Sequence, residues 1–498
     1  MRVKHRMWMV VVFLLAMLAM ATSLIAQGEA DQKPRRYKLY LVLAPGDTDS
    51  SVPGGPPTFR MLNNQGTLGS AGSTSMPDPF FGFVVHAVQS RKGVSTDLGA
   101  LPPADANFSV PYSVSDNGAM VGISGNGQID PLTGFPEFEA VSFNDGGVTD
   151  LGNFGGNGSL AISVNNRGQI VGYALNTVPD PYGSFLMGCS TTGCFPVGQQ
   201  MRAVLWDKGK MKDLGTLGGN DAVAGIINQS GQVAGTSYTN TTPNLTTGFP
   251  SQDPFFWERG EMVDVGNLGG TFAYANWMNE RGQVVGLSTL AGDNVAHPFL
   301  WDRGKLTDIG TFGGTYGEAF SVNNAGQVVG VANFAGDQLW DAFVWSKGEL
   351  TDLGNLGITS RALAINSSGQ VVGNSKVAPG TFHCFLWEKG SGMIDLNDLI
   401  PPGSGLFLQE AVYINDRGQI AGNAILDSGA MRAYLLTPCD DHPDDCRSEM
   451  VSVEASTGVG QTGVMNVAPT GDEHISSFAD LRRQLEQRHR VSVGPPVR

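Results

Sequence analysis

The stretch SVNNAGQVVG, residues 321–330, decides the fold because the chain repeats it. Four close copies are SVNNRGQIVG (163–172), WMNERGQVVG (277–286), AINSSGQVVG (364–373) and YINDRGQIAG (413–422). Each copy has two short apolar runs separated by a polar N-x-G turn. This pattern predicts a β-hairpin, because Gly has no Cβ to clash in a left-handed turn position. We therefore interpret the stretch as a hairpin that the fold needs many times, and not as a binding site.

A longer unit surrounds the hairpin. The turn glycine recurs eight times, 43 to 63 residues apart, at Gly66, Gly118, Gly168, Gly231, Gly282, Gly326, Gly369 and Gly418. A second landmark lies between these copies, in VLWDKGKMKDLG (204–215), FFWERGEMVDVG (255–266), FLWDRGKLTDIG (299–310), FVWSKGELTDLG (343–354) and FLWEKGSGMIDLN (385–397). Repeats of this period are typical of solenoids, propellers and arrays.

One unit contains four short apolar runs, as AFSVN (319–323), QVVGVA (327–332), AFVW (342–345) and LTDLG (350–354) show. Their length, their Val, Phe and Trp content and their Gly, Asn or Asp boundaries predict strands. The third run is apolar on both faces, so its sheet is expected to be covered on both sides. Four-stranded antiparallel sheets that cover one another in this way form a β-propeller.

The ends of the chain predict how the ring closes. A lone strand, YKLYLVLAP (37–45), precedes the first unit, whose first strand is expected at TFRMLN (58–63). The last unit stops after its third strand, MRAYLLTP (431–438). We therefore predict an all-β fold over residues 37–438, an eight-bladed β-propeller of four-stranded antiparallel blades, with the N-terminal strand closing the last blade. Such closure leaves no open sheet edge.

The repeats resemble the bacterial extracellular HAF-repeat family, named for a His-Ala-Phe run before the Trp. The matching segments, within residues 58–437, include DLGTLGG (213–219), DIGTFGG (308–314), AFSVNNAGQVVG (319–330) and HCFLW (383–387). The strand order also resembles that of WD40 propellers, although the Gly-His element of that family is missing. At the His position stand His86, His297 and His383, whereas other copies have Glu139, Arg202, Asp341 and Arg432. The resemblance implies a secreted repeat protein with no established activity.

Residues 1–26 read as a signal peptide, with a basic start, an apolar segment from Met7 to Ala21, and Ala19-Met20-Ala21 or Ala26 as cleavage motifs. An uncleaved N-terminal anchor is the alternative. No other segment is apolar enough to span a membrane, so we expect a secreted protein, extracellular or periplasmic. Without these residues the chain has 28 Lys and Arg against 46 Asp and Glu, a net charge of −18. This acidity excludes a nucleic-acid or anionic-membrane binder, and we expect a monomer.

The cysteines fall into two local pairs and one single residue. In an oxidising compartment we expect disulfides between Cys189 and Cys194 and between Cys439 and Cys446, with metal ligation as the alternative. Cys384 is predicted to be a buried free thiol. After the propeller we expect a disulfide loop and linker at 439–475, a short amphipathic helix at 476–490 and a tail at 491–498.

The most regular residues are interpreted as structural. The Asp of DLG is expected to cap a turn, with a ring of Ca²⁺-binding carboxylates as the alternative. The Asn of the first strand is expected to bond the turn, and the three His are expected to form polar rungs on strands, with metal ligation as the alternative. No cofactor is expected. The structural repeat residues are Asn165, Gly168, Trp206, Asp213, Asn279, Gly282, Trp301, Asp308, Asn323, Gly326, Trp345, Asp352, Asn366, Gly369, Trp387, Asn415 and Gly418.

Function is expected where the repeat is broken. Long loops between the second and third strands occur at 124–137, 173–200 and 236–252, and loops on a rigid scaffold commonly bind ligands. Their aromatic residues are predicted to form a ligand face: Phe135, Phe138, Tyr182, Phe185, Phe195, Tyr238 and Phe249. We expect a non-catalytic binding module for a glycan or envelope protein. The alternatives are a propeller enzyme, a lyase or hydrolase acting on extracellular polysaccharide, and an envelope structural protein.

Overall fold

The computed structural model describes residues 37–46, 49–53, 59–78, 82–103, 107–132, 134–144, 147–180, 182, 198–244, 248–400 and 403–439. The predicted signal peptide, the linker beyond residue 439, the 476–490 helix and the tail lie outside these ranges. Within the described residues the fold is all-β, apart from a 3₁₀ turn, η2 (Leu396–Leu399). No helix in this part of the chain could cross a membrane.

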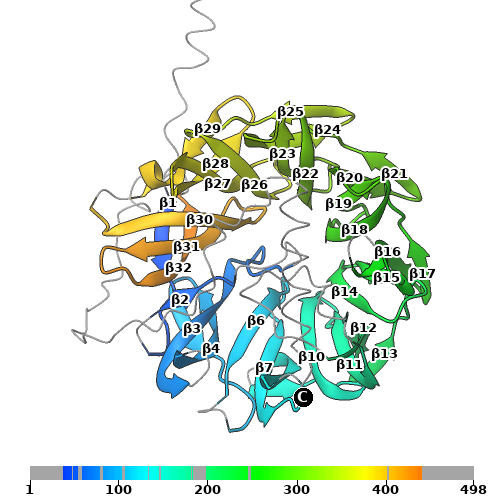
Figure 1. Ribbon diagram of the computed structural model, residues 1–498. Helices are drawn as coiled ribbons and strands as arrows, with labels where there is room; N and C mark the ends of the chain where they lie inside the picture. The colour runs from blue at the N-terminus through cyan, green and yellow to red at the C-terminus, as the bar shows by residue number, and fades with distance from the viewer. Residues whose placement is uncertain are drawn as a thin grey trace, which may run out of the picture.

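The strands form a β-propeller, in which antiparallel sheets are arranged in a ring (Figure 1). The first strands of the units are β6 (Ser109–Val114), β10 (Gly155–Val164), β14 (Ala222–Ile227), β18 (Gly269–Met278), β22 (Gly313–Val322), β26 (Thr359–Ile365) and β30 (Leu406–Ile414). The second strands are β3 (Thr67–Asp78), β7 (Met120–Ile129), β11 (Ile170–Pro179), β15 (Val233–Pro243), β19 (Val284–Leu290), β23 (Val328–Phe334), β27 (Val371–Ala378) and β31 (Ile420–Leu426).

The third strands are β4 (Gly82–Arg91), β8 (Pro136–Asn144), β12 (Gln199–Asp207), β16 (Pro250–Glu258), β20 (Ala296–Asp302), β24 (Trp340–Ser346), β28 (Thr381–Glu388) and β32 (Met431–Pro438). The fourth strands are β5 (Val94–Asp97), β9 (Gly147–Asp150), β13 (Lys210–Asp213), β17 (Glu261–Asp264), β21 (Lys305–Asp308), β25 (Glu349–Asp352) and β29 (Gly392–Asp395). Figure 1 places the fourth strands β13, β17, β21 and β25 at the outer edge of the ring and most of the first strands, here called the inner strands, toward its centre.

The N-terminal strand β1 (Tyr37–Leu41) pairs antiparallel with β32, the last of the described strands. The register runs from Tyr37 opposite Pro438 to Leu41 opposite Tyr434. This confirms the predicted pairing of the two ends of the repeat region. Because β1 joins β32, β31 and β30 in one sheet, it takes the place that a fourth strand holds in the other units.

The first unit differs from the prediction. Residues 58–63 were expected to form its first strand, but Arg60 and Leu62 make only isolated bridges, to Ser113 and Leu68 respectively. The short strand β2 (Ser50–Ser51) instead pairs with β3. The backbone N–H and carbonyl of Arg60 bond Tyr112 and Val114 of the adjacent unit, which explains the difference.

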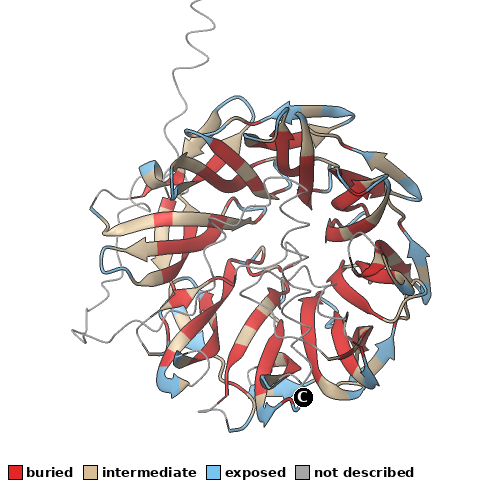
Figure 2. Cartoon of the chain, viewed as in Figure 1, coloured by how far each residue is buried: buried red, intermediate tan, exposed pale blue. Residues whose placement is uncertain are grey.

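The hairpin of residues 321–330 has the predicted construction. Gly326 has φ +78° in the turn. A Cβ on Gly330 would lie 1.9 Å from the Glu318 carbonyl oxygen, so glycine allows β22 and β23 to approach closely. Val328 packs in one hydrophobic cluster with Val285 of the preceding unit, and Val329 packs in another with Phe385 of the following unit. The hairpin therefore fills the space on both sides of its own sheet, and buried residues dominate the sheets while the outer strands are exposed (Figure 2).

Candidate functional site

The repeated Asp residues cap turns, as predicted. Each carboxylate accepts a hydrogen bond of 2.7–2.8 Å from the backbone N–H two residues later. The residues are Asp97, Asp150, Asp213, Asp264, Asp308, Asp352 and Asp395. They lie on separate strands, and the described residues contain no group of three or more His, Cys, Asp or Glu that could hold a metal ion.

The repeated Asn residues do more than bond their own turns. In Asn165 the side-chain oxygen accepts hydrogen bonds from the N–H groups of Arg167 and Gln169. Its side-chain amide also donates to the carbonyl of Asn228 in the next unit, at 3.1 Å. The same link, 2.8–3.4 Å long, starts from Asn63, Asn228, Asn279, Asn323, Asn366 and Asn415. We call these seven residues, together with Ser115, the asparagine belt.

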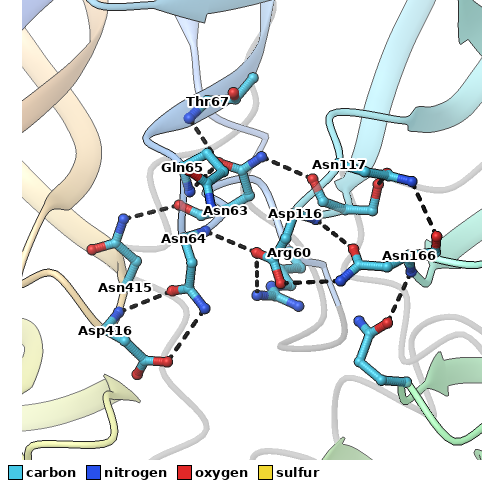
Figure 3. Close-up of polar contacts among 12 residues, drawn as sticks. Arg60, Asn63, Asn64, Gln65, Thr67, Asp116, Asn117, Asn166, Asn415 and Asp416 are labelled. Atoms are coloured by element: carbon cyan, nitrogen blue, oxygen red, sulfur yellow. Dashed lines mark hydrogen bonds and ion pairs between the residues drawn. The ribbon is translucent and has the colours of Figure 1, made fainter.

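The belt also joins the last unit to the first and the first to the second (Figure 3). Asn415, in the last unit, donates to the carbonyl of Asn63 in the first unit, which in turn donates to Ser115. The Ser115 side chain is too short to reach the next unit. The Asn117 side-chain amide donates to the Asn166 carbonyl instead, at 3.0 Å. The belt therefore confirms the structural interpretation of the repeated Asn and adds a linking role that the hairpin pattern does not reveal.

The His residues form rungs between the third and fourth strands. His86, His297 and His383 each contact the DLG carboxylate of their own unit, through Asp97, Asp308 and Asp395. Arg202 makes the same contact with Asp213 at 3.0 Å. The polar-rung interpretation is thus confirmed for all three His. The charge on His297 and its hydrogen bond outweigh burial, so the pKa of Asp308 is lowered.

Other units carry an acid where these units carry His or Arg. Glu139, Asp253 and Asp341 cannot pair with the DLG carboxylate, and each accepts hydrogen bonds of 2.9–3.1 Å from an Asn that follows it by fourteen residues. These amides belong to Asn153, Asn267 and Asn355. Burial and the nearby DLG carboxylate raise the pKa of Asp253 and of Asp341 to about 6. The rung is therefore polar in both kinds of unit. One kind pairs His or Arg with the DLG carboxylate, and the other pairs an acid with an Asn amide.

Three of the seven residues predicted for the aromatic ligand face do not lie on the surface. Phe138, Tyr238 and Phe249 are buried in hydrophobic clusters, because the loops that carry them extend the β-hairpins and turn these rings inward. Phe135 is 42% exposed. Phe185 and Phe195 lie outside the described residues, as do Cys189, Cys194 and Cys446, so both predicted disulfides stay predictions. Cys384 is a buried free thiol, as predicted.

Tyr182 lies between two of the clusters. Its ring packs against the cluster that contains Tyr238 and also against the cluster that contains Phe249 and Tyr316. Its carbonyl accepts a hydrogen bond from the Tyr238 hydroxyl at 2.9 Å. Tyr182, within the 173–200 insertion, therefore packs against two hydrophobic clusters of the ring and is not fully exposed.

A polar cluster on four consecutive inner strands was not predicted. Tyr274 on β18, Glu318 on β22, Arg361 on β26 and Glu410 on β30 occupy the same position, directly before an Ala of their strand. The equivalent residues on β6, β10 and β14 are Val110, Leu160 and Val223. We call Tyr274, Asn276, Tyr316, Glu318, Arg361 and Glu410 the inner-strand polar cluster. The signal was present in the sequence, at the residue before Ala in the A-x-x-I/V-N pattern.

Glu318 organises this cluster. Its carboxylate accepts hydrogen bonds from the Tyr274 hydroxyl and the Asn276 amide, both at 2.8 Å, and from the Tyr316 hydroxyl at 2.5 Å. Burial, together with the Glu318 charge, raises the pKa of Tyr316 well above its usual value. Both tyrosines of the cluster therefore act as hydrogen-bond donors to a carboxylate at neutral pH.

Arg361 is the cation of the cluster, and the charges of both carboxylates act on it. Its Nε donates to Asn374 at 3.0 Å, and Glu410 accepts from Asn423 at 3.1 Å. Burial lowers the pKa of Arg361, whereas the charges of Glu410 and Glu318 act in the opposite direction. The cluster thus combines one cation, two carboxylates, amides and phenols. On β6, β10 and β14 the equivalent position is apolar. Nearby, the ring of Phe59 is stacked on that of Tyr112, with 4.3 Å between their centroids.

Comparison with solved structures finds propeller proteins. The chain is similar to the β-propeller domain of the Trilobed protease from Pyrococcus furiosus, with a TM-score of 0.40 and 9% identity over 73% of this chain and 100% of that chain. It is similar to Pyrococcus horikoshii acylaminoacyl peptidase, with a TM-score of 0.40 and 9% identity over 76% of this chain but only 57% of that chain. The chain therefore spans less than two thirds of the peptidase.

A third similar structure is a polysaccharide lyase, the PL25 ulvan lyase, with a TM-score of 0.33 and 10% identity over 73% of this chain and 97% of that chain. These similarities are too distant to transfer an activity. No family model matches the sequence, and no curated protein matches it.

Proposed function

We propose that the chain is a secreted, monomeric, eight-bladed β-propeller that binds a glycan without catalysis, and that the inner-strand polar cluster is its binding site. The blade count is supported by the eight turn glycines and by the pairing of β1 with β32. Export is supported by the signal-like sequence of residues 1–26 and by the resemblance to secreted HAF-repeat proteins.

One observation carries the binding proposal. The repeat keeps its apolar residues on β6, β10 and β14 but replaces them on β18, β22, β26 and β30 with Tyr274, Glu318, Arg361 and Glu410. Buried or half-buried polar side chains in an inner strand cost folding free energy unless they are bonded, and a hydrophobic residue would fill the same position. Four consecutive replacements at one position therefore indicate a function beyond folding.

The chemistry of the cluster suits a sugar. Hydroxyl groups act as donors and acceptors, and the cluster offers both: carboxylate oxygens from Glu318 and Glu410, and N–H donors from Arg361. Binding sites commonly combine a few placed polar groups with an apolar wall. The aromatic pair on the other part of the ring, Phe59 and Tyr112, packs in a hydrophobic cluster, so the polar groups carry this proposal.

The test is a glycan-array screen of the mature protein, followed by calorimetric titration of the glycans that bind. We expect R361Q and E410Q to weaken binding at least tenfold while each variant keeps its circular dichroism spectrum. R303A is the matched control, because the Arg303 side chain is 85% exposed and lies in the turn between β20 and β21, outside the cluster. Absence of any bound glycan, or unchanged affinity in both cluster variants, contradicts the proposal and favours a protein partner.

A second candidate function is hydrolysis or elimination on a polysaccharide. The observation that favours it is the presence of two carboxylates, Glu318 and Glu410, that both act on the charge of Arg361. Paired carboxylates are the usual machinery of glycoside hydrolysis. Each bound glycan should therefore be assayed for new reducing ends and for unsaturated products. Turnover that E410Q abolishes while binding remains would replace the non-catalytic proposal with an enzymatic one.

A further inference from the structure

Two buried carboxyl groups meet where the 173–200 insertion leaves its sheet. Asp180 directly follows β11 and is 3% exposed, and Asp221 directly precedes β14 and is 0% exposed. Asn220, the residue before Asp221, donates its side-chain amide to Asp180 at 2.7 Å, and the charge of Asp180 acts on Asp221. At the position of Asp221 the neighbouring units have Gly158 and Phe272, so the acid pair occurs where the repeat is again broken.

The hydrogen bonds of the pair are unequal. Both Asp180 oxygens accept hydrogen bonds of 2.7 Å, one from the Tyr182 N–H and one from the Asn220 side-chain amide. Asp221 Oδ1 accepts a hydrogen bond of 2.7 Å from the Met201 N–H. No donor among the described residues reaches Asp221 Oδ2, although this atom is buried. A buried, unpaired carboxylate oxygen beside a second carboxylate is costly unless a proton or a cation lies between them.

The charged and titratable neighbours of the pair do not take the place of a proton. Arg202 on β12 is the nearby cation, but its guanidinium bonds Asp213 and the Asn220 carbonyl. The other titratable neighbours are Tyr238 on β15 and Tyr182, and burial with the two Asp charges raises the pKa of Tyr238. Burial, and then the charge of Asp180, raises the pKa of Asp221 to about 7, against the opposing effect of Arg202.

We propose that Asp180 and Asp221 share one proton, carried on Asp221 Oδ2 and donated to Asp180, and that this proton fixes Tyr182 between the two halves of the ring. Tyr182 is attached to the pair through its N–H, and its ring contacts the clusters on both sides. Tyr274 of the inner-strand polar cluster packs against one of these clusters. When the proton leaves, two adjacent negative charges repel, and the hydrogen bond from the Tyr182 N–H to Asp180 is weakened. The shared proton is thus a pH-sensitive lock beside the proposed binding site, and it stands whether or not that site binds a glycan.

The stability of the wild-type protein depends on this proton in a defined direction. The folded state holds it up to about pH 7, whereas an unfolded Asp loses it near pH 4. Stability is therefore lost as pH rises from about 4 to about 7 and is then constant. In D221N the side-chain amide donates to Asp180 at every pH, so it imitates the protonated pair.

The experiment compares the full mature protein with D221N by thermal and chemical unfolding from pH 4 to pH 9, with D427N as a control at an exposed turn. We expect the unfolding equilibrium constant of the wild type relative to D221N to grow by up to about tenfold per pH unit between pH 4 and 7, and not beyond. We expect D427N to follow the wild type. A constant difference between wild type and D221N overturns the proposal.

Two measurements on the wild type keep the test decisive if D221N folds poorly. The infrared difference spectrum at pH 6 should show a protonated carboxyl band that disappears by pH 9. Hydrogen exchange of the Tyr182 amide, corrected for its intrinsic pH dependence, should accelerate above pH 7. A missing carboxyl band, or a wild-type melting temperature that falls when EDTA is added, would show a cation in place of the proton and overturn the proposal.

Discussion

The side-chain amide of Asn415 donates a hydrogen bond to the backbone carbonyl of Asn63 at 2.9 Å, although 352 residues separate them in the sequence. Asn415 is buried, and its side-chain oxygen also accepts from the N–H groups of Arg417 and Gln419. One side chain thus holds its own turn and joins the last repeat to the first. The ring is closed at this point by the same contact that joins its other units.

Replacement of Asn415 tests the strength of this closure. N415A removes the acceptor of the Arg417 and Gln419 N–H groups and one donor to the Asn63 carbonyl, which keeps its hydrogen bond from the Gly66 N–H. Because each unsatisfied buried group costs about 1–3 kcal/mol, we expect the free energy of unfolding to fall by about 2 kcal/mol or more. Urea denaturation of N415A and of N294A, an exposed turn asparagine, measures the difference. Equal losses in the two variants would show that the belt does not stabilise the ring.

The last glycine of the repeated hairpin is predicted to be irreplaceable. In G330A the new Cβ would lie 1.9 Å from the Glu318 carbonyl oxygen, and backbone atoms cannot move away cheaply. We expect a loss of about 3 kcal/mol, or failure to fold. G336A is the matched control, because Gly336 has φ +89° but open space around it, so only about 1 kcal/mol of conformational strain is expected. Similar melting temperatures for the two variants would contradict the packing argument.

The two kinds of polar rung are predicted to be interchangeable. Asp253 has a folded pKa of about 6, above its unfolded value, so its contribution to stability is lost as pH rises from about 4 to about 6. D253H with N267T copies the rung of His297 and Thr311 and removes this loss. We expect a gain of about 1 kcal/mol at pH 7 that disappears near pH 4, as measured by thermal unfolding across this range.

The single variant N267T sharpens this prediction. It removes the amide that bonds Asp253 and leaves the carboxylate beside Asp264, so it should be less stable than the wild type at pH 7. A stable N267T, or a double variant no more stable than N267T, would mean that the rung is not a matched pair.

Cys384 is predicted to be inert in the folded protein. Its side chain is 0% exposed, and burial raises the pKa of the thiol. The thiolate, which is the reactive form, is therefore scarce and shielded. Iodoacetamide followed by peptide mass spectrometry should label Cys384 only in denaturant. Rapid labelling under native conditions would show that this strand opens locally.

Much of the fold follows from local pattern. The strands, the turn glycines and the capping carboxylates each depend on residues within one hairpin, so the repeat predicts them. The pairing of Tyr37 with Pro438 is also predictable, because the last unit lacks a fourth strand and an additional strand precedes the first unit. The first strand of the first unit is not, since Arg60 pairs with the neighbouring unit at Ser113.

The candidate site was harder to predict because its members meet only in three dimensions. Glu318 and Arg361 are one repeat apart, and nothing within either strand indicates the other. Exposure failed as a guide for Tyr238 and Phe249, since a long loop that extends a hairpin packs its aromatic residues inward. Comparison of the residue before Ala across all units would have revealed the cluster, because the break is visible only when the copies are aligned with one another.

The antiparallel pairing of β1 with β32 has a mechanical consequence. Tyr37 and Pro438 lie opposite each other, so both ends of the propeller leave from the same edge of one sheet. A force that pulls the two ends apart would act on the five residue pairs of this ladder one after another, like a zipper, because the hydrogen bonds of an antiparallel pair run across the strands. Under low tension the propeller would therefore open first at the pairing of β1 with β32.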